Sequence, residues 1–255
     1  MAITIKNARE IDLMRQAGLV VAKVHARLQE EVAPGVTTGE LDDIAREIIE
    51  AEGAVSNFYG HHGFTGRICA SINNEIVHGI PGKRSLKDGD IISLDVGAIV
   101  GGYHGYSAWT YAVGQISQEA ADLLEVTEAS LYEGIAQARA GNRLGAIGHA
   151  VEEYATSRGY GLVREYGGHG IGRQMWEDPH IPNHGSPERG IVLRAGMTLA
   201  IEPMLNTGGD ETRALVDGWT VVTADGSLSA HFEHTVVVTE GEPEILTRRL
   251  SSVVK

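Results

Sequence analysis

Three carboxylates each stand inside an otherwise apolar segment that we predict to be a strand, and this pattern constrains the chain more than any other feature of its sequence. The acids are Asp95 in Ile91–Val100, Glu202 in Met197–Met204 and Glu233 in His231–Val238. Burying an unpaired carboxylate costs on the order of several kcal/mol, so we expect a chain to do this repeatedly only around a cation. For one acid alone, a buried arginine partner or an exposed strand end would be the better interpretation.

A histidine adds a nitrogen donor to these acids. His169 stands in the glycine-rich segment Gly167–Gly172. Imidazole nitrogen together with carboxylate oxygen is typical of divalent metal sites. The sequence therefore predicts a metal site formed by Asp95, His169, Glu202 and Glu233.

The composition limits the environment and the partners of the protein. With 255 residues, 42% of them hydrophobic, the chain can bury a substantial core. Its 34 acidic and 21 basic residues give a net charge of −13, which disfavours binding to nucleic acid. A single cysteine, Cys69, excludes an internal disulfide and fits a reducing cytoplasm. Because no apolar segment approaches the roughly 20 residues of a membrane span, we expect a cytoplasmic protein that does not enter membranes.

Capping patterns predict four helices. Asn7 with Glu10 begins a helix that ends before residue 34, and Thr37 with Glu40 begins a second that ends by residue 53. Ser117 begins a third helix that runs to about residue 140, and a fourth follows over about residues 144–158.

Strand patterns fill the segments between and after these helix pairs. Residues 67–77 predict strand and turn, and residues 91–100 and 103–113 predict a hairpin. The order of two helices followed by strands occurs twice, so we expect one α+β domain over 1–255 with pseudo-symmetric halves of about 1–115 and 116–255. In this architecture one antiparallel sheet curves around the site, and two pairs of helices cover it.

Six short segments, taken in order along the chain, carry a specific resemblance. They are Val77–Gly82, Leu94–Gly97, Gly102–Gly105, Gly168–Gly172, Ile201–Met204 and Phe232–Thr235. On these segments the chain resembles the type I methionine aminopeptidases over nearly its whole length. The resemblance implies the pita-bread fold, which that family shares with prolidases and creatinase.

The resemblance also implies the chemistry and the partners. Enzymes of this family hold two adjacent divalent ions (Co, Mn, Fe or Zn) and hydrolyse the peptide bond after an N-terminal methionine of peptides or nascent polypeptides, as monomers. By this resemblance Asp95 would bind one ion, His169 and Glu202 the other, and Glu233 would bridge them. His78 matches a histidine that contacts the substrate beside the metals. The predicted methionine pocket consists of Phe58, Phe64, Cys69 and Trp219, although ordinary core packing explains each of these four about equally well.

One departure from the family pattern falls at the centre of the expected metal site. The pattern requires a second bridging aspartate where this chain has Tyr106. A phenol has an ordinary pKa of about 10, and a metal ion can lower it and bind the phenolate, as in haem catalase. One phenolate oxygen is nevertheless a poor replacement for a two-oxygen bridge, so Tyr106 is expected to line the substrate pocket. His104, two residues earlier on the same strand face, is an alternative donor, although an ordinary polar contact is the better interpretation.

A second departure falls at a catalytic position. Trp176 stands where the family has a histidine that polarises the scissile group. An indole donates one hydrogen bond but cannot accept or shuttle a proton. Help of that kind is typically worth about 10²–10⁴-fold in rate. The indole is also larger than imidazole and is expected to intrude on the cleft.

These departures leave three hypotheses for the function. The first is a methionine aminopeptidase of strongly reduced activity that holds one metal ion, or none, on the remaining ligands. The second is a non-catalytic protein that binds a peptide or another ligand in the narrowed cleft, since tyrosine and tryptophan are good contact residues. The third is a hydrolase of another small amide or peptide.

Overall fold

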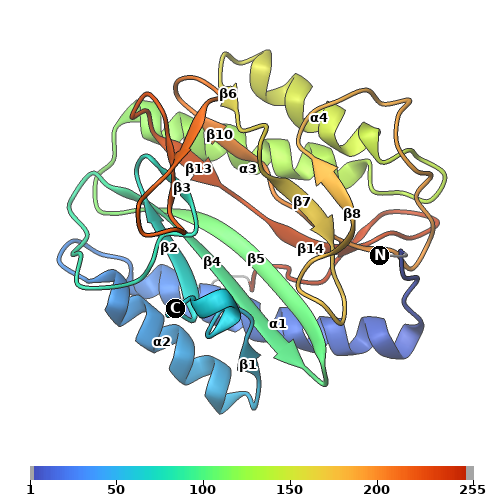
Figure 1. Ribbon diagram of the computed structural model, residues 1–255, viewed down its shortest axis with the longest axis horizontal. Coiled ribbons are helices and arrows are strands. Elements are labelled where there is room, and N and C mark those ends of the chain that lie inside the picture. Colours follow the sequence, from blue (N-terminus) through green and yellow to red (C-terminus); the bar gives the residue numbers. More distant parts are fainter. Residues whose placement is uncertain (1–2, 251–255) are drawn as a thin grey trace.

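The structure is a computed structural model that describes residues 3–250 of the chain (Figure 1). Four α-helices occupy the segments expected from the sequence: α1 (Ala8–Glu31), α2 (Thr38–Ala51), α3 (Gln118–Ala136) and α4 (Gly145–Thr156). Both predicted capping boxes form: Asn7 accepts the backbone N–H of Glu10, and Thr37 accepts that of Glu40. Helix α3 ends earlier than predicted because the Ala140 amide donates to Thr239 at 2.9 Å, which draws the chain out of the helix.

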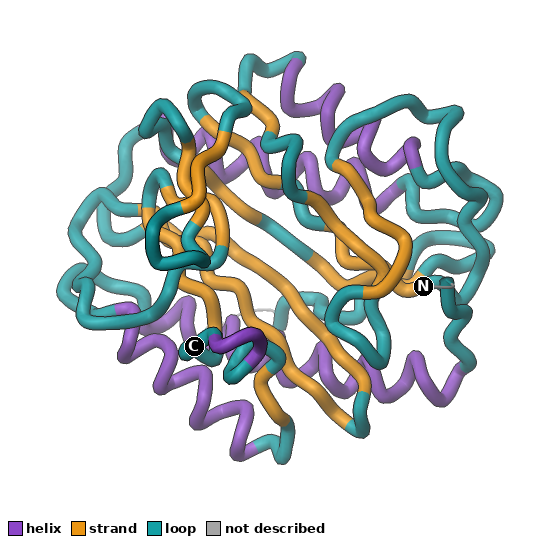
Figure 2. Tube along the Cα trace, in the orientation of Figure 1, coloured by secondary structure: helices purple, strands orange, loops and turns teal. Residues whose placement is uncertain are grey.

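Figure 2 shows where the strands lie between the helices. Among residues 3–250 the strands pair in antiparallel fashion and form four sheets. The first contains β1 (Val55–Ser56), β2 (Ile68–Ile72), β4 (Ile91–Val100) and β5 (Tyr103–Ala112). The second contains β7 (Gly167–Gly170), β8 (Glu177–Pro182), β9 (Thr198–Ile201), β14 (His234–Val237) and β15 (Glu244–Ile245). The third joins β6 (Gly161–Leu162), β10 (Met204–Asn206) and β13 (Ser229–His231), and the fourth joins β3 (Glu75–Val77), β11 (Thr212–Ala214) and β12 (Val221–Thr223). A 3₁₀ turn, η1 (His61–Gly63), lies between β1 and β2.

The predicted β4–β5 hairpin is confirmed. It is continuous in register from Ile91 opposite Ala112 to Val100 opposite Tyr103. Gly101 and Gly102 form its turn with φ values of 57° and 80°, a region that side chains disfavour. Asp95 lies near the middle of β4 in this hairpin and is buried.

Helices cover the strands in two pairs (Figure 1). Helix α1 contacts β4 and β5, while α3 contacts β13, β10 and β9, and α4 contacts β6 and β8. The largest apolar core cluster runs from α1 through the hairpin to α3 and the C-terminal strands. This arrangement confirms the predicted α+β fold, although hydrogen bonding divides the strands into four sheets where we expected one. The division into two related halves stays a prediction.

The sequence predicted that all three acids lie inside strands. Two of them, Glu202 and Glu233, lie instead at breaks between strands. Glu202 follows β9 and precedes Pro203, which has no N–H to continue a strand ladder. Glu233 lies between β13 and β14, where the chain passes from one sheet to another.

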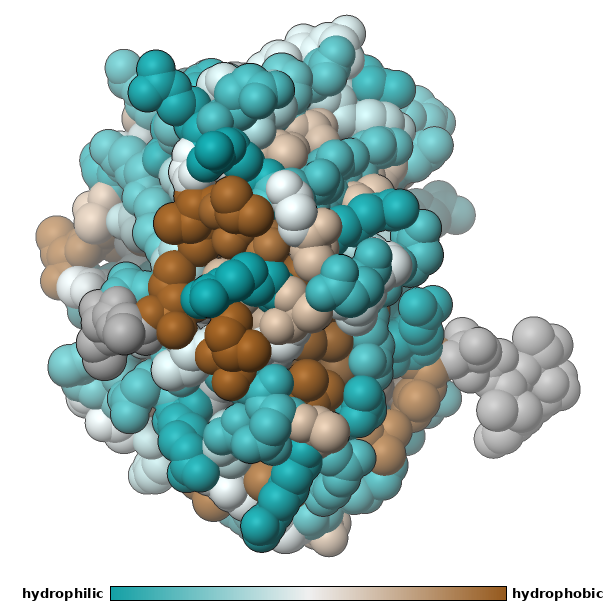
Figure 3. Space-filling model, turned by 90° about the vertical axis from the view of Figure 1, so that its right-hand side faces the viewer, coloured by the Kyte–Doolittle hydropathy of each residue, from teal (hydrophilic) through white to brown (hydrophobic). Residues whose placement is uncertain are grey.

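Among the described residues, no helix is long and apolar enough to cross a membrane. Hydrophobic residues gather on one side of the molecule, around a few hydrophilic ones (Figure 3).

Candidate metal centre

Three of the predicted metal ligands converge. One donor atom each from His169, Glu202 and Glu233 lies within 4.8 Å of the other two. The strand register produces this convergence, because β9 pairs with β7 on one side and with β14 on the other. Ala200 in β9 is opposite both His169 and Thr235. Residues that flank this crossing therefore meet although they are distant in sequence.

The hydrogen bond of His169 fixes its tautomer. Its Nδ1 lies 2.7 Å from the carbonyl oxygen of Gly170, and a carbonyl only accepts, so Nδ1 carries the proton. The lone pair on Nε2 then faces Glu202 Oε1 at 3.6 Å. Nε2 is buried and has no hydrogen-bond partner among the described residues. Two acceptors that face each other in this way form a favourable contact only with a cation between them.

Within residues 3–250, the carboxylates of Glu233 and Asp95 also have buried oxygens without a partner. Both Oε atoms of Glu233 and Oδ1 of Asp95 are buried without a hydrogen-bond partner in the part of the chain that the structure describes. Burial, followed by the nearby Glu202, raises the pKa of both carboxyls well above the ordinary values. A set of carboxylate oxygens and one imidazole nitrogen is one that a divalent ion binds at about 2.0–2.2 Å. The residues present therefore fit one divalent metal ion.

Tyr106 lies on the Asp95 face of the hairpin. Asp95 is opposite Ala108 and Gly97 is opposite Tyr106, so the phenol is the diagonal neighbour of the carboxyl on one face. The Tyr106 ring packs edge-on against Phe58 at 5.6 Å and lies 5.7 Å from the His169 ring. Burial, followed by the charges of Asp95 and Glu233, raises the pKa of the phenol well above 10. Without a metal ion, Tyr106 is therefore a neutral phenol.

A small apolar cavity adjoins the cluster. Its walls are Phe58, His61, Phe64, Cys69, His78, Met175, Trp176 and Trp219. The structure thus brings together four of the five residues predicted for the substrate pocket with His78 and Trp176, whereas Tyr106 is not among the walls of this cavity. The cavity measures about 10 Å³, which is roughly the room that one water molecule needs. As it stands, the pocket is too small for a methionine side chain.

Trp176 stands at the mouth of this cavity. Its side chain is 43% exposed, and its ring packs edge-on against that of His61 at 4.9 Å. The next residue, Glu177, forms an ion pair of 2.6 Å with Lys6 and accepts the amide of Arg173 at 2.8 Å. The loop that carries the indole is therefore anchored, and the indole occupies space that imidazole would leave free.

Three residues near the cluster were not predicted from the sequence. His61 and Met175 line the cavity, and His231 Nε2 lies 3.5 Å from Glu202 Oε2. No local sequence signal marks His231, because its approach to Glu202 depends on the pairing of β13 with β10. His104 is not part of the three-residue cluster, and its backbone amide donates to Gly172 at 2.8 Å. Burial lowers the pKa of His104 to about 4.

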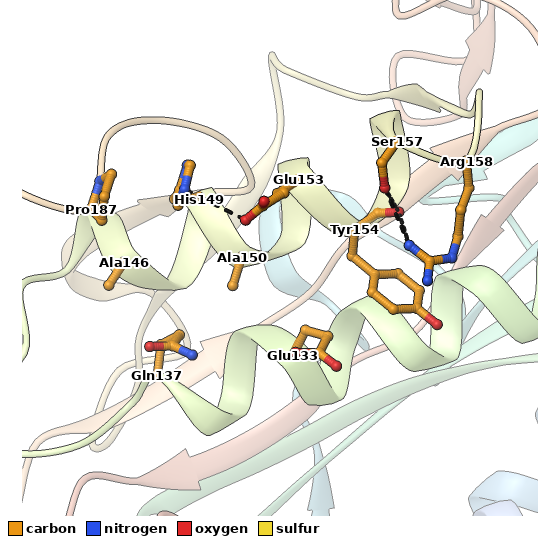
Figure 4. A pocket seen from close by; sticks show the side chains of 10 residues that line it. All are labelled: Glu133, Gln137, Ala146, His149, Ala150, Glu153, Tyr154, Ser157, Arg158 and Pro187. Atoms are coloured by element: carbon orange, nitrogen blue, oxygen red, sulfur yellow. Dashed lines mark hydrogen bonds and ion pairs between the residues drawn. The ribbon is translucent and has the colours of Figure 1, made fainter.

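A second, larger depression lies between α3 and α4 and has a volume of about 390 Å³ (Figure 4). Its lining includes Glu133, His149 and Glu153, and the His149–Glu153 pair spans 3.7 Å. Arg158 stacks on the ring of Tyr154 at 3.6 Å. Arg158 also donates to the Tyr154 carbonyl at 3.0 Å, and none of the residues that line this depression belongs to the metal cluster.

Comparison with known families identifies the class of protein that this fold and cluster define. The model of metallopeptidase family M24 matches residues 12–240. The chain therefore belongs to metallopeptidase family M24, whose members are metal-dependent peptidases. Its similarity within that family is to the methionine aminopeptidases. It is 53% identical to methionine aminopeptidase 1 of Bacillus subtilis over 96% of this chain and 99% of that protein.

Other relatives agree with this assignment. The chain is 48% identical to methionine aminopeptidase 1 of Mycobacterium tuberculosis over 95% of this chain and 94% of that protein. Its structure superposes on methionine aminopeptidase from Thermotoga maritima with a TM-score of 0.96 and 42% identity, covering 97% of this chain and all of that one. A prolidase from Pyrococcus horikoshii shares the fold with a TM-score of 0.77 at 19% identity. The predicted family and the pita-bread fold are thus confirmed.

Proposed function

We propose that this protein removes N-terminal methionine from peptides and nascent polypeptides with one divalent metal ion, and that Tyr106 and Trp176 reduce its turnover. The observation that carries the proposal is the convergence of His169, Glu202 and Glu233 next to an apolar pocket. The likeness to methionine aminopeptidases supports the choice of methionine as the residue removed. The metal ligands and the roles of the pocket residues are parts of this proposal.

The proposal assigns metal binding to the three clustered residues and substrate contact to His78. Bound to His169, Glu202 and Glu233, a divalent ion supplies a Lewis acid and lowers the pKa of water. His78 lies on the cavity wall, 6.4 Å from the Trp219 ring, where its imidazole contacts the N-terminal region of the substrate. Its φ of 62° is a costly conformation for a residue with a side chain, and such conformations cluster at functional sites.

In this proposal Tyr106 and Trp176 lower the turnover in different ways. A neutral, buried phenol does not supply the two negatively charged oxygens of a bridging carboxylate, so it leaves the donors for a second ion incomplete. The indole of Trp176 neither accepts nor transfers a proton. Entry of a methionine side chain also requires the Trp176 ring to move away from His61, because the cavity is otherwise too small for it.

The closed cavity favours a second candidate, in which the cleft binds a ligand without turnover or hydrolyses an amide whose first residue is smaller than methionine. The peptides Met-Ala-Ser and Ala-Ala-Ser, each incubated with the Mn²⁺-loaded protein, separate these functions. We expect slow cleavage of Met-Ala-Ser that a chelator stops and that Glu233→Gln abolishes. Faster cleavage of Ala-Ala-Ser would favour the small-residue hydrolase, and Mn²⁺ binding without any cleavage would favour the binding protein.

A further inference from the structure

A second buried histidine, His231, points at the carboxylate of Glu202. His231 is the last residue of β13, and it is 2% exposed. Its Nε2 has no hydrogen-bond partner among residues 3–250 and lies 3.5 Å from Glu202 Oε2. Burying a ring nitrogen without a hydrogen-bond partner costs free energy. The position of this nitrogen next to a carboxylate therefore indicates a role for His231.

The Glu202 carboxylate lies between two imidazoles. Oε1 faces His169 Nε2 at 3.6 Å, and Oε2 faces His231 Nε2 at 3.5 Å. The backbone carbonyl of Glu202 accepts the side-chain amide of Asn183 at 2.9 Å, which fixes the backbone but leaves the carboxylate to the histidines. His169 belongs to the three-residue donor cluster, whereas His231 does not. The two oxygens of Glu202 therefore have different neighbours: one faces the cluster and the other faces His231.

The backbone of His231 is held rigidly. The Thr110 hydroxyl accepts the His231 N–H at 2.9 Å and donates to its carbonyl oxygen at 2.9 Å. Thr110 is itself bonded to the hydroxyl of Ser93 at 2.8 Å. These hydrogen bonds tie the backbone of His231 to the β4–β5 hairpin, so its imidazole extends from a fixed backbone position beside the Glu202 carboxylate.

We propose that His231 is a positioning residue, whose Nε2–H donates to Glu202 Oε2 and keeps Oε1 turned toward the metal ion. This inference rests on the metal centre of the proposed function and adds a residue to it. A movement of about half an ångström by the carboxylate brings the 3.5 Å contact to normal hydrogen-bond length. Carboxylate ligands are generally held by such outer hydrogen bonds, whose loss typically lowers metal affinity by about 10–100-fold.

The test compares two substitutions in the full chain by calorimetric titration with Mn²⁺. His231→Leu removes the donor, and His231→Gln keeps an N–H donor that can reach Glu202. We expect the leucine variant to bind Mn²⁺ about 10–100-fold more weakly and the glutamine variant to bind within a few-fold of the original protein. His25→Leu is the matched control, because His25 is also a buried histidine but contacts Tyr111 and Ser107. It is expected to lower the melting temperature without changing the Mn²⁺ affinity.

Each outcome has a distinct meaning. Unchanged affinity in the leucine variant would overturn the positioning role and leave His231 as a packing residue. A glutamine variant as weak as the leucine variant would also overturn it, because an N–H donor at this position would then not restore the affinity. Mn²⁺ binding with the expected series but without peptide cleavage would overturn only the proposed function, whereas an original protein that binds no Mn²⁺ would overturn both.

Discussion

The β4–β5 hairpin and the C-terminal ligand strands β7, β9 and β14 contribute unequally to the cluster. The C-terminal strands and their junctions supply His169, Glu202 and Glu233, while the hairpin carries Asp95, which is outside this three-residue cluster, and places Tyr106 beside it. The hairpin backbone is nevertheless fully integrated: Thr235 Oγ1 accepts the Tyr106 N–H at 3.1 Å and donates to its carbonyl at 2.8 Å. The comparison shows that backbone hydrogen bonds hold β5 in place at position 106, and that these bonds do not depend on the side chain at that position.

The largest effect is expected when the two residues that depart from the family pattern, Tyr106 and Trp176, are replaced by the residues of that pattern. Tyr106→Asp with Trp176→His supplies a second bridging carboxylate and a proton-transfer group. We expect the double variant to cleave Met-Ala-Ser about 10²–10⁴-fold faster than the original protein, which is the range that general acid–base catalysis supplies. Each single variant serves as a control. A folded, Mn²⁺-loaded double variant that is no faster than the original protein would contradict our assignment of these two positions.

A second test removes ligands from each side in turn. Glu202→Ala deletes a member of the three-residue cluster and is expected to weaken Mn²⁺ binding by more than about 100-fold, because a direct ligand contributes more than an outer-shell partner. Asp95→Ala is expected to weaken it by less than about 10-fold, since Asp95 is outside that cluster. Equilibrium dialysis measures both affinities. Equal losses would show that the hairpin contributes as much to the site as the C-terminal strands.

A third test concerns the hairpin scaffold and pH. His25 on α1 contacts the carbonyl of Ser107 at 2.9 Å and the hydroxyl of Tyr111 at 2.8 Å, both on β5. Burial lowers the pKa of His25 to about 4, whereas the unfolded chain has about 6.5. His25 is therefore neutral in both states above pH 6.5, and below it the unfolded state takes up the proton first. The stability that this group contributes is complete above pH 6.5 and is lost as the pH falls toward 4.

The difference in pKa corresponds to about 3 kcal/mol, of which about 2 kcal/mol is lost by pH 5. Urea unfolding at pH 7 and pH 5, with chelator present, measures the free energy of unfolding. We expect His25→Gln to remove this part of the pH dependence. Parallel losses in the original protein and the variant would show that protonation of His25 does not limit the stability of the α1–hairpin contact.

The smallest effect is expected at the helix that covers the hairpin. The Asn7 side chain caps α1, whereas Leu144 at the start of α4 makes no side-chain cap. Asn7→Ala should lower the free energy of unfolding by about 1 kcal/mol, and Asn7→Asp should keep it close to the original value. Chemical denaturation distinguishes the two variants. A loss in the aspartate variant equal to that in the alanine variant would indicate a role for Asn7 other than capping.

The sequence predicted the features that depend on local patterns. Capping boxes marked α1 and α2, and the glycine pair marked the hairpin turn, because these signals lie within a few residues of each other. Isolated acids in apolar segments identified Asp95, Glu202 and Glu233, since burial of a charge is costly in any fold.

Features that depend on contacts between distant segments could not be predicted. The approach of His231 to Glu202 arises where β13 pairs with β10, and the packing of His61 on Trp176 joins segments more than 100 residues apart. The end of α3 at Ala136 depends on the hydrogen bond from Ala140 to Thr239. The small volume of the cavity likewise depends on how eight side chains from several elements meet.

The number of metal ions per chain tests our central claim most directly. The claim is that the C-terminal strands hold one ion on His169, Glu202 and Glu233, and that Tyr106 leaves the hairpin side without a bridge. Protein dialysed against excess Mn²⁺, freed of unbound ion and analysed by atomic emission should contain one manganese per chain. Two per chain would contradict the claim, because a group on the hairpin side, Tyr106 or His104, would then complete a second site.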